Sequence, residues 1–383
     1  MTKLPGEFPL PRDAFERQRS LIGAHAGGGP QPSRLTARRL AAIGAVILVG
    51  GLLVTPALGL GGRLLDLFES DPGPPGGRTP TWSADGRRIA FLSRRRPGKW
   101  ELHVVNADGS GPRMLMPDVR LTALSWSPDG RRIAVAGPGQ GTVGLSVVNT
   151  DGSGRRRLSR RAEAPAWSPD GSKIAYASDG VWVVNADGSG RRQLTTQSAG
   201  RYTRLHWSPD GRKLAFLGRG SCGQFCFHLY VMNADGTNVR DLTPDLATTG
   251  PRQGVIDPVW SPNGRLIAFV QRAAEAIFVV KPDGTGLSRL TRVRAGYAAP
   301  AWSPTGRMLA FVTDRDGNSE VYVMNADGSK PRNLTRHPGY DADPMWSPNG
   351  QRITFVSNRD GDYEIHVMNA DGSQQRRLTH RDG

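Results

Sequence analysis

Residues 126–130 read Trp-Ser-Pro-Asp-Gly, and the same five residues recur at 167–171 and 207–211. Close variants of this segment stand at 82–86, 260–264, 302–306 and 346–350. In such a segment proline presets the backbone of a tight turn, and glycine adopts the positive φ that other residues avoid. From about residue 78 onward, the sequence therefore consists of seven copies of one unit built around a turn.

Each copy continues with short apolar segments that are typical of strands. An apolar run such as Ile267-Ala268-Phe269 follows the turn, and a further strand such as Glu320–Met324 comes next. A second turn, Asn-Ala-Asp-Gly at 106–109 and in most other copies, leads to a last short strand that usually ends in Leu-Thr. Four short strands with a period of about 40–45 residues are typical of a propeller blade. We therefore expect an all-β, seven-bladed β-propeller of four-stranded blades over residues 78–383.

The repeated tryptophans have a structural explanation. No blade can bury both of its faces alone, so neighbouring blades must stack around a ring to form the core. The tryptophans occupy one position of the motif, and we interpret them as core residues that pack between blades. Because the last copy ends in its own fourth strand at 376–379, we expect the ring to close without a strand from the N-terminus.

The composition changes before the first copy. Residues 1–39 are basic and glycine-containing, which indicates a flexible tail, and residues 40–62 are 23 consecutive uncharged residues. At about 1.5 Å per residue, a helix of that length crosses the roughly 30 Å hydrocarbon layer of a membrane. A juxtamembrane turn and a proline- and glycine-rich tether follow over residues 63–77. The sequence therefore predicts one transmembrane helix ahead of the propeller.

The basic residues also predict an orientation. Arginines stand mainly before the apolar segment, and excess basic charge stays in the cytoplasm. We therefore expect a single-pass protein of the cytoplasmic membrane with its N-terminus inside and its propeller outside. The segment is interpreted as an uncleaved signal anchor. A cleaved signal peptide is the alternative, although 39 residues before the apolar segment is long for one.

The repeat Trp-Ser-Pro-Asp-Gly, Ile-Ala-Phe, Val-Met-Asn-Ala-Asp-Gly-Ser and Leu-Thr resembles the TolB-type, WD-repeat-like β-propeller repeat over residues 78–379. The resemblance implies the propeller fold and, by analogy with TolB, partner binding in a cell-envelope complex. TolB has a small α/β domain before its propeller, where we expect a membrane anchor here. Similar propellers precede the hydrolase domain of prolyl peptidases. Because the sequence contains no Gly-x-Ser-x-Gly nucleophile motif, we expect no enzymatic activity.

Recognition is expected on one face of the propeller. In a four-stranded meander, the first and third turns of every blade lie on one face, and the remaining loops lie on the other. The first set is nearly invariant here, whereas the second ranges from Gly180 alone, between two strands of blade 3, to the long segments Gly218–Phe227 and Pro244–Asp257. We call these the uniform face and the variable face, and predict a binding surface on the variable face near blades 4 and 5. The candidate partner-binding residues are Arg204, Arg219, Phe225, Arg252, Asp257, Tyr202, Tyr297, Asp341 and Asp343.

Two further features bear on covalent and metal chemistry. Cys222 and Cys226 lie in one loop, and outside the cytoplasm we expect them to form a local disulfide. Free thiols and a redox or metal pair are the alternatives, although the spacing is not Cys-x-x-Cys. No cofactor is expected. Calcium stays open at the acidic loops 314–320 and 358–364, which lack the spacing of a calcium-binding loop.

The formal net charge is +16, with arginine runs at 155–157, 160–161, 191–192 and 376–377. Such charge attracts acidic wall polymers or lipid headgroups, or it merely protects outer strands from pairing. An external location argues against nucleic acid as a partner. We therefore predict a membrane-anchored, extracytoplasmic scaffold that binds envelope proteins or acidic wall polymers. The alternatives are a ligand or glycan sensor at the channel mouth and a channel-site lyase or hydrolase, for which His206 is the candidate histidine.

Overall fold

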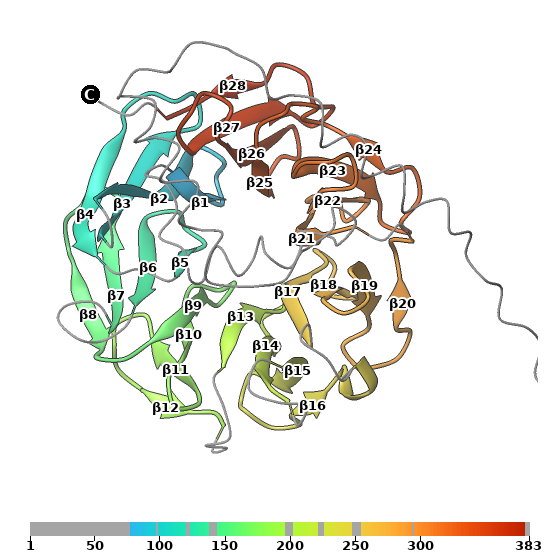
Figure 1. The fold of residues 1–383 in the computed structure, drawn as a ribbon. Coiled ribbons are helices and arrows are strands. Elements are labelled where there is room, and N and C mark those ends of the chain that lie inside the picture. Colours follow the sequence, from blue (N-terminus) through green and yellow to red (C-terminus); the bar gives the residue numbers. More distant parts are fainter. Residues whose placement is uncertain are drawn as a thin grey trace, which may run out of the picture. The chain divides into compact units, whose positions relative to one another are not determined.

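The computed structural model describes residues 77–96, 99–119, 123–137, 144–195, 202–220, 226–246, 254–292 and 295–379. In this part of the chain the strands form seven antiparallel sheets of four strands, and each sheet follows the order of the sequence. Figure 1 shows the sheets as blades around a central opening, with the first strand of each blade innermost and the fourth outermost. This arrangement confirms the predicted all-β, seven-bladed propeller.

The strands match the seven sequence copies one blade at a time. Blades 1 to 3 comprise β1 (Gly77–Trp82), β2 (Arg88–Arg96), β3 (Lys99–Asn106) and β4 (Arg113–Val119); β5 (Ala123–Trp126), β6 (Arg132–Gly137), β7 (Gly144–Asn149) and β8 (Arg156–Ser159); and β9 (Glu163–Trp167), β10 (Lys173–Ala177), β11 (Val181–Asn185) and β12 (Arg192–Gln193). Blades 4 and 5 comprise β13 (Thr203–Trp207), β14 (Lys213–Arg219), β15 (Phe227–Asn233) and β16 (Arg240–Asp241); and β17 (Val255–Trp260), β18 (Ile267–Gln271), β19 (Ala276–Val280) and β20 (Ser288–Arg289). Blades 6 and 7 comprise β21 (Tyr297–Trp302), β22 (Met308–Thr313), β23 (Glu320–Asn325) and β24 (Arg332–Asn333); and β25 (Asp341–Trp346), β26 (Arg352–Ser357), β27 (Glu364–Asn369) and β28 (Arg376–Arg377). The short 3-10 helix η2 (Pro244–Leu246) follows blade 4.

The turn after each tryptophan is held by the serine that follows it. In blade 2 the backbone N–H of Arg132 donates to Oγ of Ser127 at 2.9 Å, and that hydroxyl donates to Oδ1 of Asp129 at 2.5 Å. Gly130 has a φ of +64°, as the turn requires. The serine is buried in every blade, so its hydrogen bonds are part of the core rather than of the surface.

Hydrogen bonds between turns confirm the two faces. On the uniform face, the backbone N–H of Ala186 in the third turn of blade 3 donates to the carbonyl of Ser172 in the first turn, at 2.8 Å. On the variable face, the N–H of Asp341 at the start of blade 7 donates to the carbonyl of Ser319, in a loop of blade 6, at 2.9 Å. One loop differs from the sequence prediction. β10 ends at Ala177 and β11 begins at Val181, so three residues separate these strands rather than Gly180 alone.

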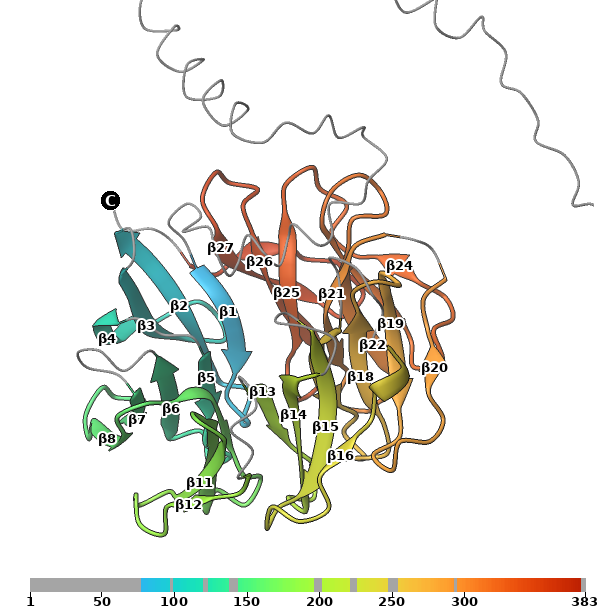
Figure 2. The ribbon, with the colours of Figure 1, turned by 60° about the horizontal axis from the view of Figure 1, so that its bottom comes forward.

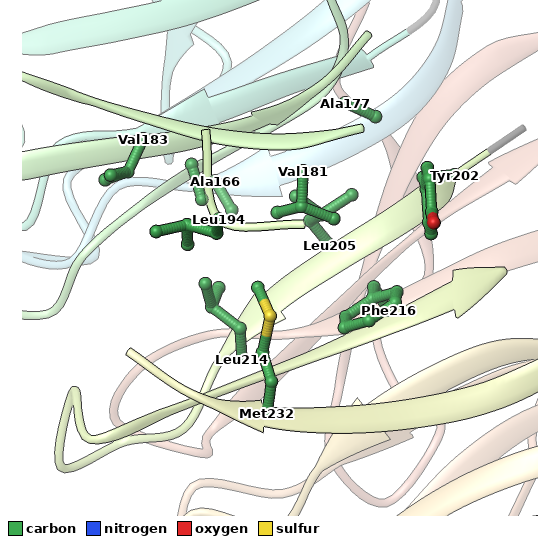
Figure 3. Close-up of a cluster of buried hydrophobic side chains, with 11 residues drawn as sticks. Ala166, Ala177, Val181, Val183, Leu194, Tyr202, Leu205, Leu214, Phe216 and Met232 are labelled. Atoms are coloured by element: carbon green, nitrogen blue, oxygen red, sulfur yellow. The ribbon is translucent and has the colours of Figure 1, made fainter. Parts of the chain in front are cut away.

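The core lies between blades rather than within them. Each main hydrophobic cluster draws its side chains from two neighbouring blades, as Figure 3 shows for blades 3 and 4. There Leu194 and Val183 of blade 3 pack with Leu214, Phe216 and Met232 of blade 4, and most of these side chains are under 5% exposed. Figure 2 shows the ring turned by 60°, with successive blades stacked side by side. Stacking is therefore what removes apolar surface from water.

The repeated tryptophans form a ring of hydrogen bonds, which we call the tryptophan girdle. In six of the seven blades the indole N–H donates to the carbonyl of the residue that precedes the tryptophan of the previous blade. The bonds run from Trp126 to Thr81 (3.1 Å), Trp207 to Ala166 (3.0 Å), Trp260 to His206 (3.2 Å), Trp302 to Val259 (3.3 Å), Trp346 to Ala301 (3.1 Å) and Trp82 to Met345 (3.3 Å). Trp167 is the exception, because its indole N–H is buried without a partner. The interpretation of these tryptophans as inter-blade core residues is thus confirmed.

A second ring of contacts, which we call the arginine girdle, lies near the outer strands. An arginine at the start of a fourth strand donates to the aspartate carbonyl in the Asn-Ala-Asp-Gly-type turn of the next blade. The pairs are Arg113 to Asp151 (3.1 Å), Arg192 to Asp235 (3.2 Å), Arg240 to Asp283 (2.7 Å), Arg332 to Asp371 (2.9 Å) and Arg376 to Asp108 (3.2 Å). Part of the positive charge therefore serves to join neighbouring blades.

The ring closes without strand exchange, as predicted. All four strands of blade 7 come from the C-terminal copy, and all four strands of blade 1 come from the N-terminal one. The closing interface is made by side chains: a cluster that includes Trp82 and Phe91 packs against Ile365 and Leu378. Trp82 and Arg376 extend the two girdles across this seam.

The predicted tail, membrane segment and tether (residues 1–39, 40–62 and 63–77) lie outside the described residues, apart from Gly77, with which β1 begins. Among the residues that are described, no helix is both long and apolar enough to cross a membrane. The membrane anchor and the orientation remain predictions.

The girdle yields a prediction about stability. Trp302→Phe and Trp346→Phe each remove one inter-blade hydrogen bond and leave a carbonyl, half-buried for Trp302 and buried for Trp346, without its indole donor. They should lower the free energy of unfolding by about 1–2 kcal/mol more than Trp167→Phe does. Trp167→Phe is the matched control, because it makes the same change of ring where no hydrogen bond exists. Urea unfolding of the full chain, followed by circular dichroism, measures the difference; equal losses in all three variants would contradict it.

Candidate functional site

The innermost strands share an irregularity that shapes the channel wall. In blades 1 and 3 to 7 the register of the first strand shifts by a bulge near the residue three positions before the tryptophan. That residue has a left-handed backbone, which is rare for residues other than glycine: Thr79, Ala164, Arg204, Asp257, Ala299 and Asp343 have φ between 48° and 54°. A bulge redirects a side chain out of the regular alternation of the strand. Three of the predicted site residues occupy this one position.

Two of these residues join blades 4 and 5. Arg204 on β13 and Asp257 on β17 form an ion pair with 3.4 Å between Nη2 and Oδ1. The Arg204 side chain is 58% exposed, whereas that of Asp257 is 13% exposed. Oδ2 of Asp257 also accepts the backbone N–H of Ala299 in blade 6 at 3.2 Å. Asp257 therefore links three blades, and Arg204 presents its charge to solvent.

His206 lies beside this pair, on the same strand as Arg204. It is partly exposed, and its carbonyl accepts the indole N–H of Trp260. Burial of the imidazole and the nearby Arg204 charge lower the pKa of His206 to about 4, although Asp257 opposes the shift. A general base works best with a pKa near the operating pH. His206 is therefore neutral at pH 7 and poorly matched to proton abstraction.

Asp341 has a different role from the one its position in the sequence predicts. Its side chain is 0% exposed, and both of its carboxylate oxygens lie 3.2 Å from Nη2 of Arg359. Arg359 in turn donates to Oγ of Ser357 and to Oε1 of Gln375. Burial raises the pKa of Asp341, and the hydrogen bond from Ser357 and the Arg359 charge counteract this rise. Asp341 is thus part of the internal structure of blade 7 rather than an exposed contact residue.

Of the remaining candidates, the structure describes the side chains of two and leaves three outside the described part. Tyr202 is buried and packs edge-on against Phe216, with 5.7 Å between the ring centroids, while Arg219 is exposed at the end of β14. Tyr297 begins β21, but its side chain lies outside the described part of the structure. Phe225 and Arg252 also lie outside the described residues.

The predicted disulfide is described on one side. Cys226 is buried and disulfide-bonded, and its carbonyl accepts the N–H of Gly220 at 2.8 Å. Cys222 lies outside the described residues. The pairing of the two cysteines therefore stays a prediction.

The two acidic loops use their polar side chains to hold the backbone. Oδ1 of Asp314 accepts the N–H of Gly296 at 2.6 Å, and Oδ1 of Asn358 accepts the N–H of Tyr340 at 2.7 Å. Oδ2 of Asp316 accepts the hydroxyl of Tyr322 and the side-chain amide of Asn333. Across the described residues, no group of three histidine, cysteine, aspartate or glutamate side chains is arranged to hold a metal ion. These loops join neighbouring segments of the variable face.

Sequence reasoning missed Arg359, the partner of Asp341. In the sequence, Arg359 stands in the loop 358–364, which resembles a hairpin turn. That resemblance does not indicate that Arg359 pairs with a residue of another segment of blade 7. It also missed the shared bulge position, because no residue type marks it: threonine, alanine, arginine and aspartate all occur there.

The family model of the TolB β-propeller domain matches residues 77–252, 162–294 and 219–383. The chain belongs to this family. Its described blades and their tryptophan turns are therefore those of a TolB-type propeller.

Solved structures with similar folds have varied activities. The chain is similar to a putative TolB from Agrobacterium tumefaciens, at 24% identity and a TM-score of 0.48 over 61% of this chain and 87% of that chain. It is similar to oligogalacturonate lyase from Vibrio parahaemolyticus, at 14% identity and a TM-score of 0.60 over 75% of this chain and 87% of that one. It is also similar to a puromycin-hydrolysing peptidase of Mycobacterium tuberculosis, at 15% identity and a TM-score of 0.65 over 80% of this chain and 53% of that one. At these identities the likeness shows the fold alone.

The buried ion pair predicts a large effect of one substitution. Arg359→Leu leaves the Asp341 carboxylate buried without its cation, which should cost about 3–5 kcal/mol of stability at pH 7. An acid whose pKa is higher in the folded state stabilises the fold when it is protonated. Part of the loss should therefore be regained as the pH falls from 7 towards 4. The control Arg377→Leu, which loses a half-exposed pair with Asp360, should cost under about 1 kcal/mol. Denaturant unfolding across pH measures both effects.

The lowered pKa of His206 predicts a second way in which the stability of the fold depends on pH. Its pKa of about 4 in the fold lies below the value of about 6.5 expected in the unfolded chain. Stability should therefore fall as the pH drops from about 6.5 to 4, by on the order of 2 kcal/mol, because only the unfolded state takes up the proton readily. His206→Gln should remove this part of the pH dependence. An imidazole NMR titration near 6.5 in the native protein would disprove the prediction.

Proposed function

We propose that this protein is a membrane-anchored, extracytoplasmic TolB-type propeller that binds another protein of the cell envelope through its variable face near blades 4 and 5. Membership of the TolB propeller family and the predicted anchor at residues 40–62 support an envelope role. The observation that carries the proposed surface is the Arg204–Asp257 pair, an exposed cation held across two blades by a half-buried anion.

The chemistry of the pair suits recognition of a protein. Because Asp257 is anchored to Ala299, the pair holds Arg204 in place before a partner arrives, which reduces the entropy lost on binding. Arginine is enriched at interface positions that dominate binding energy. The two long segments predicted on the variable face, Gly218–Phe227 and Pro244–Asp257, belong to the same two blades or the link between them.

One observation favours a second candidate function. Arg204, Asp257 and His206 come together at the channel wall, so a small anionic ligand is an alternative occupant. Catalysis is not proposed, because His206 is the histidine of this cluster and its low pKa makes it a weak base at neutral pH.

A photo-crosslinking amino acid at position 204 of the full chain tests the proposal in intact cells. We expect it to form a discrete adduct with another protein, and we expect the Arg204→Ala substitution to weaken capture through a second crosslinker at Arg219 by about tenfold. A crosslinker at Arg131, which is exposed on the uniform face, is the matched control and should form no such adduct.

Two results would overturn the proposal. Equal adducts from positions 204 and 131 would mean that the surface is not selective. If protease added outside spheroplasts leaves the propeller intact until the membrane is broken, the extracytoplasmic location is wrong. A thermal shift with a small anion, abolished by Arg204→Ala in the absence of any protein adduct, would favour the sensor.

A further inference from the structure

A cavity of about 460 Å³ that is open to solvent lies between blades 2 and 3, away from the channel-wall pair. Its walls come from β8 and the link that follows it, from the loop between β10 and β11, and from the residue that precedes β12. Binding sites for small molecules typically enclose about 300–1,000 Å³, so this cavity has room for more than a single ion.

The charge of the cavity is strongly positive. Arg157, Arg160, Arg161 and Arg191 line it together with one acidic residue, Asp179, which leaves a net formal charge of +3. Within the described part of the chain, none of the four arginines forms an ion pair. They also do not belong to the arginine girdle, whose members donate to carbonyls of the next blade. Their charge is therefore available to a ligand.

The walls of the cavity are held in place by other contacts. The guanidinium of Arg191 lies over the ring of Trp182, with 4.4 Å to the centroid, and the indole N–H of Trp182 donates to Oδ1 of Asp179 at 2.8 Å. An arginine stacked in this way keeps the N–H donors at its edge free for hydrogen bonds. At the end of β8, Oγ of Ser159 donates to the carbonyl of Arg161 at 3.0 Å.

A buried hydroxyl group without a partner lies next to the cavity. Tyr176 on β10 is 0% exposed, and its hydroxyl oxygen has no hydrogen-bond partner. Ser159 and Arg191, which both line the cavity, are polar groups that interact with this hydroxyl. Tyr176 is not itself among the residues that line the cavity, so it contributes to the site through Ser159 and Arg191.

We propose that the cavity between blades 2 and 3 binds the phosphate monoester group of a small organic phosphate. A phosphate monoester carries nearly two negative charges and three terminal oxygens, which suits several arginines better than a single carboxylate does. The volume beyond the phosphate accommodates the organic part, next to the Asp179 carboxylate. The site is separate from the partner surface proposed on blades 4 and 5, so either proposal can fail without the other.

Isothermal titration calorimetry of the full chain with glucose 6-phosphate, gluconate, glucose and inorganic phosphate tests the site at low salt. We expect glucose 6-phosphate to bind, inorganic phosphate to bind more weakly and glucose not to bind. The double variant Arg160→Gln and Arg161→Gln should weaken binding of glucose 6-phosphate by at least about tenfold, because it removes two charge-assisted contacts. Arg131→Gln with Arg212→Gln, two exposed arginines of the uniform face, is the control of equal charge and should change binding by less than about twofold.

The outcomes separate the site from a general effect of positive charge. Equal weakening in the two double variants, or equal affinity for glucose 6-phosphate and gluconate, would overturn the proposal. Vesicles that contain phosphatidic acid distinguish a lipid source of the phosphate from a free one. Binding of vesicles that only the cavity variant loses would support a lipid headgroup as the ligand. Binding that both variants lose equally would indicate a non-specific surface.

Discussion

Contact between neighbouring blades is the constraint on which this structure depends. A four-stranded sheet with apolar residues on both sides has no internal partner for them, so every blade relies on the blade before it and the blade after it. The tryptophan girdle adds direction to that contact. Except at Trp167, each indole N–H reaches the same backbone position in the previous blade, which restrains how the next sheet stacks. The arginine girdle repeats this restraint at the outer strands.

The same two girdles explain how the ring closes. Many closed folds join their ends by pairing strands from both termini, but here blades 1 and 7 are each complete. Closure instead depends on packing, on Trp82 and on Arg376, which make across the seam the contacts that their counterparts make elsewhere. The closing interface is therefore chemically equivalent to the others, which fits a chain built from seven similar copies.

A rigid ring leaves function to positions that the repeat does not fix. The bulged residue of the innermost strand is one such position, since its backbone is constant and its side chain ranges from alanine to arginine. The cavity between blades 2 and 3 is another, because there the arginines are not engaged in joining blades. Both places combine a fixed backbone with a variable side chain, which is the arrangement that permits a repeated scaffold to acquire specific binding.

The sequence by itself determined the blade count, the strand order and the two faces, because Trp-Ser-Pro-Asp-Gly and Asn-Ala-Asp-Gly specify local turns whose chemistry depends on neighbours along the chain. It also indicated that the tryptophans are core residues. Only the tertiary structure showed that Asp341 is buried against Arg359, that Arg204 and Asp257 pair across blades, and that some arginines join blades while others line a cavity. These facts depend on distances between residues that are not neighbours in the sequence. The distance between Asp341 and Arg359 is fixed when the strands of blade 7 pair, and the contacts between blades are fixed only when the blades stack into a ring.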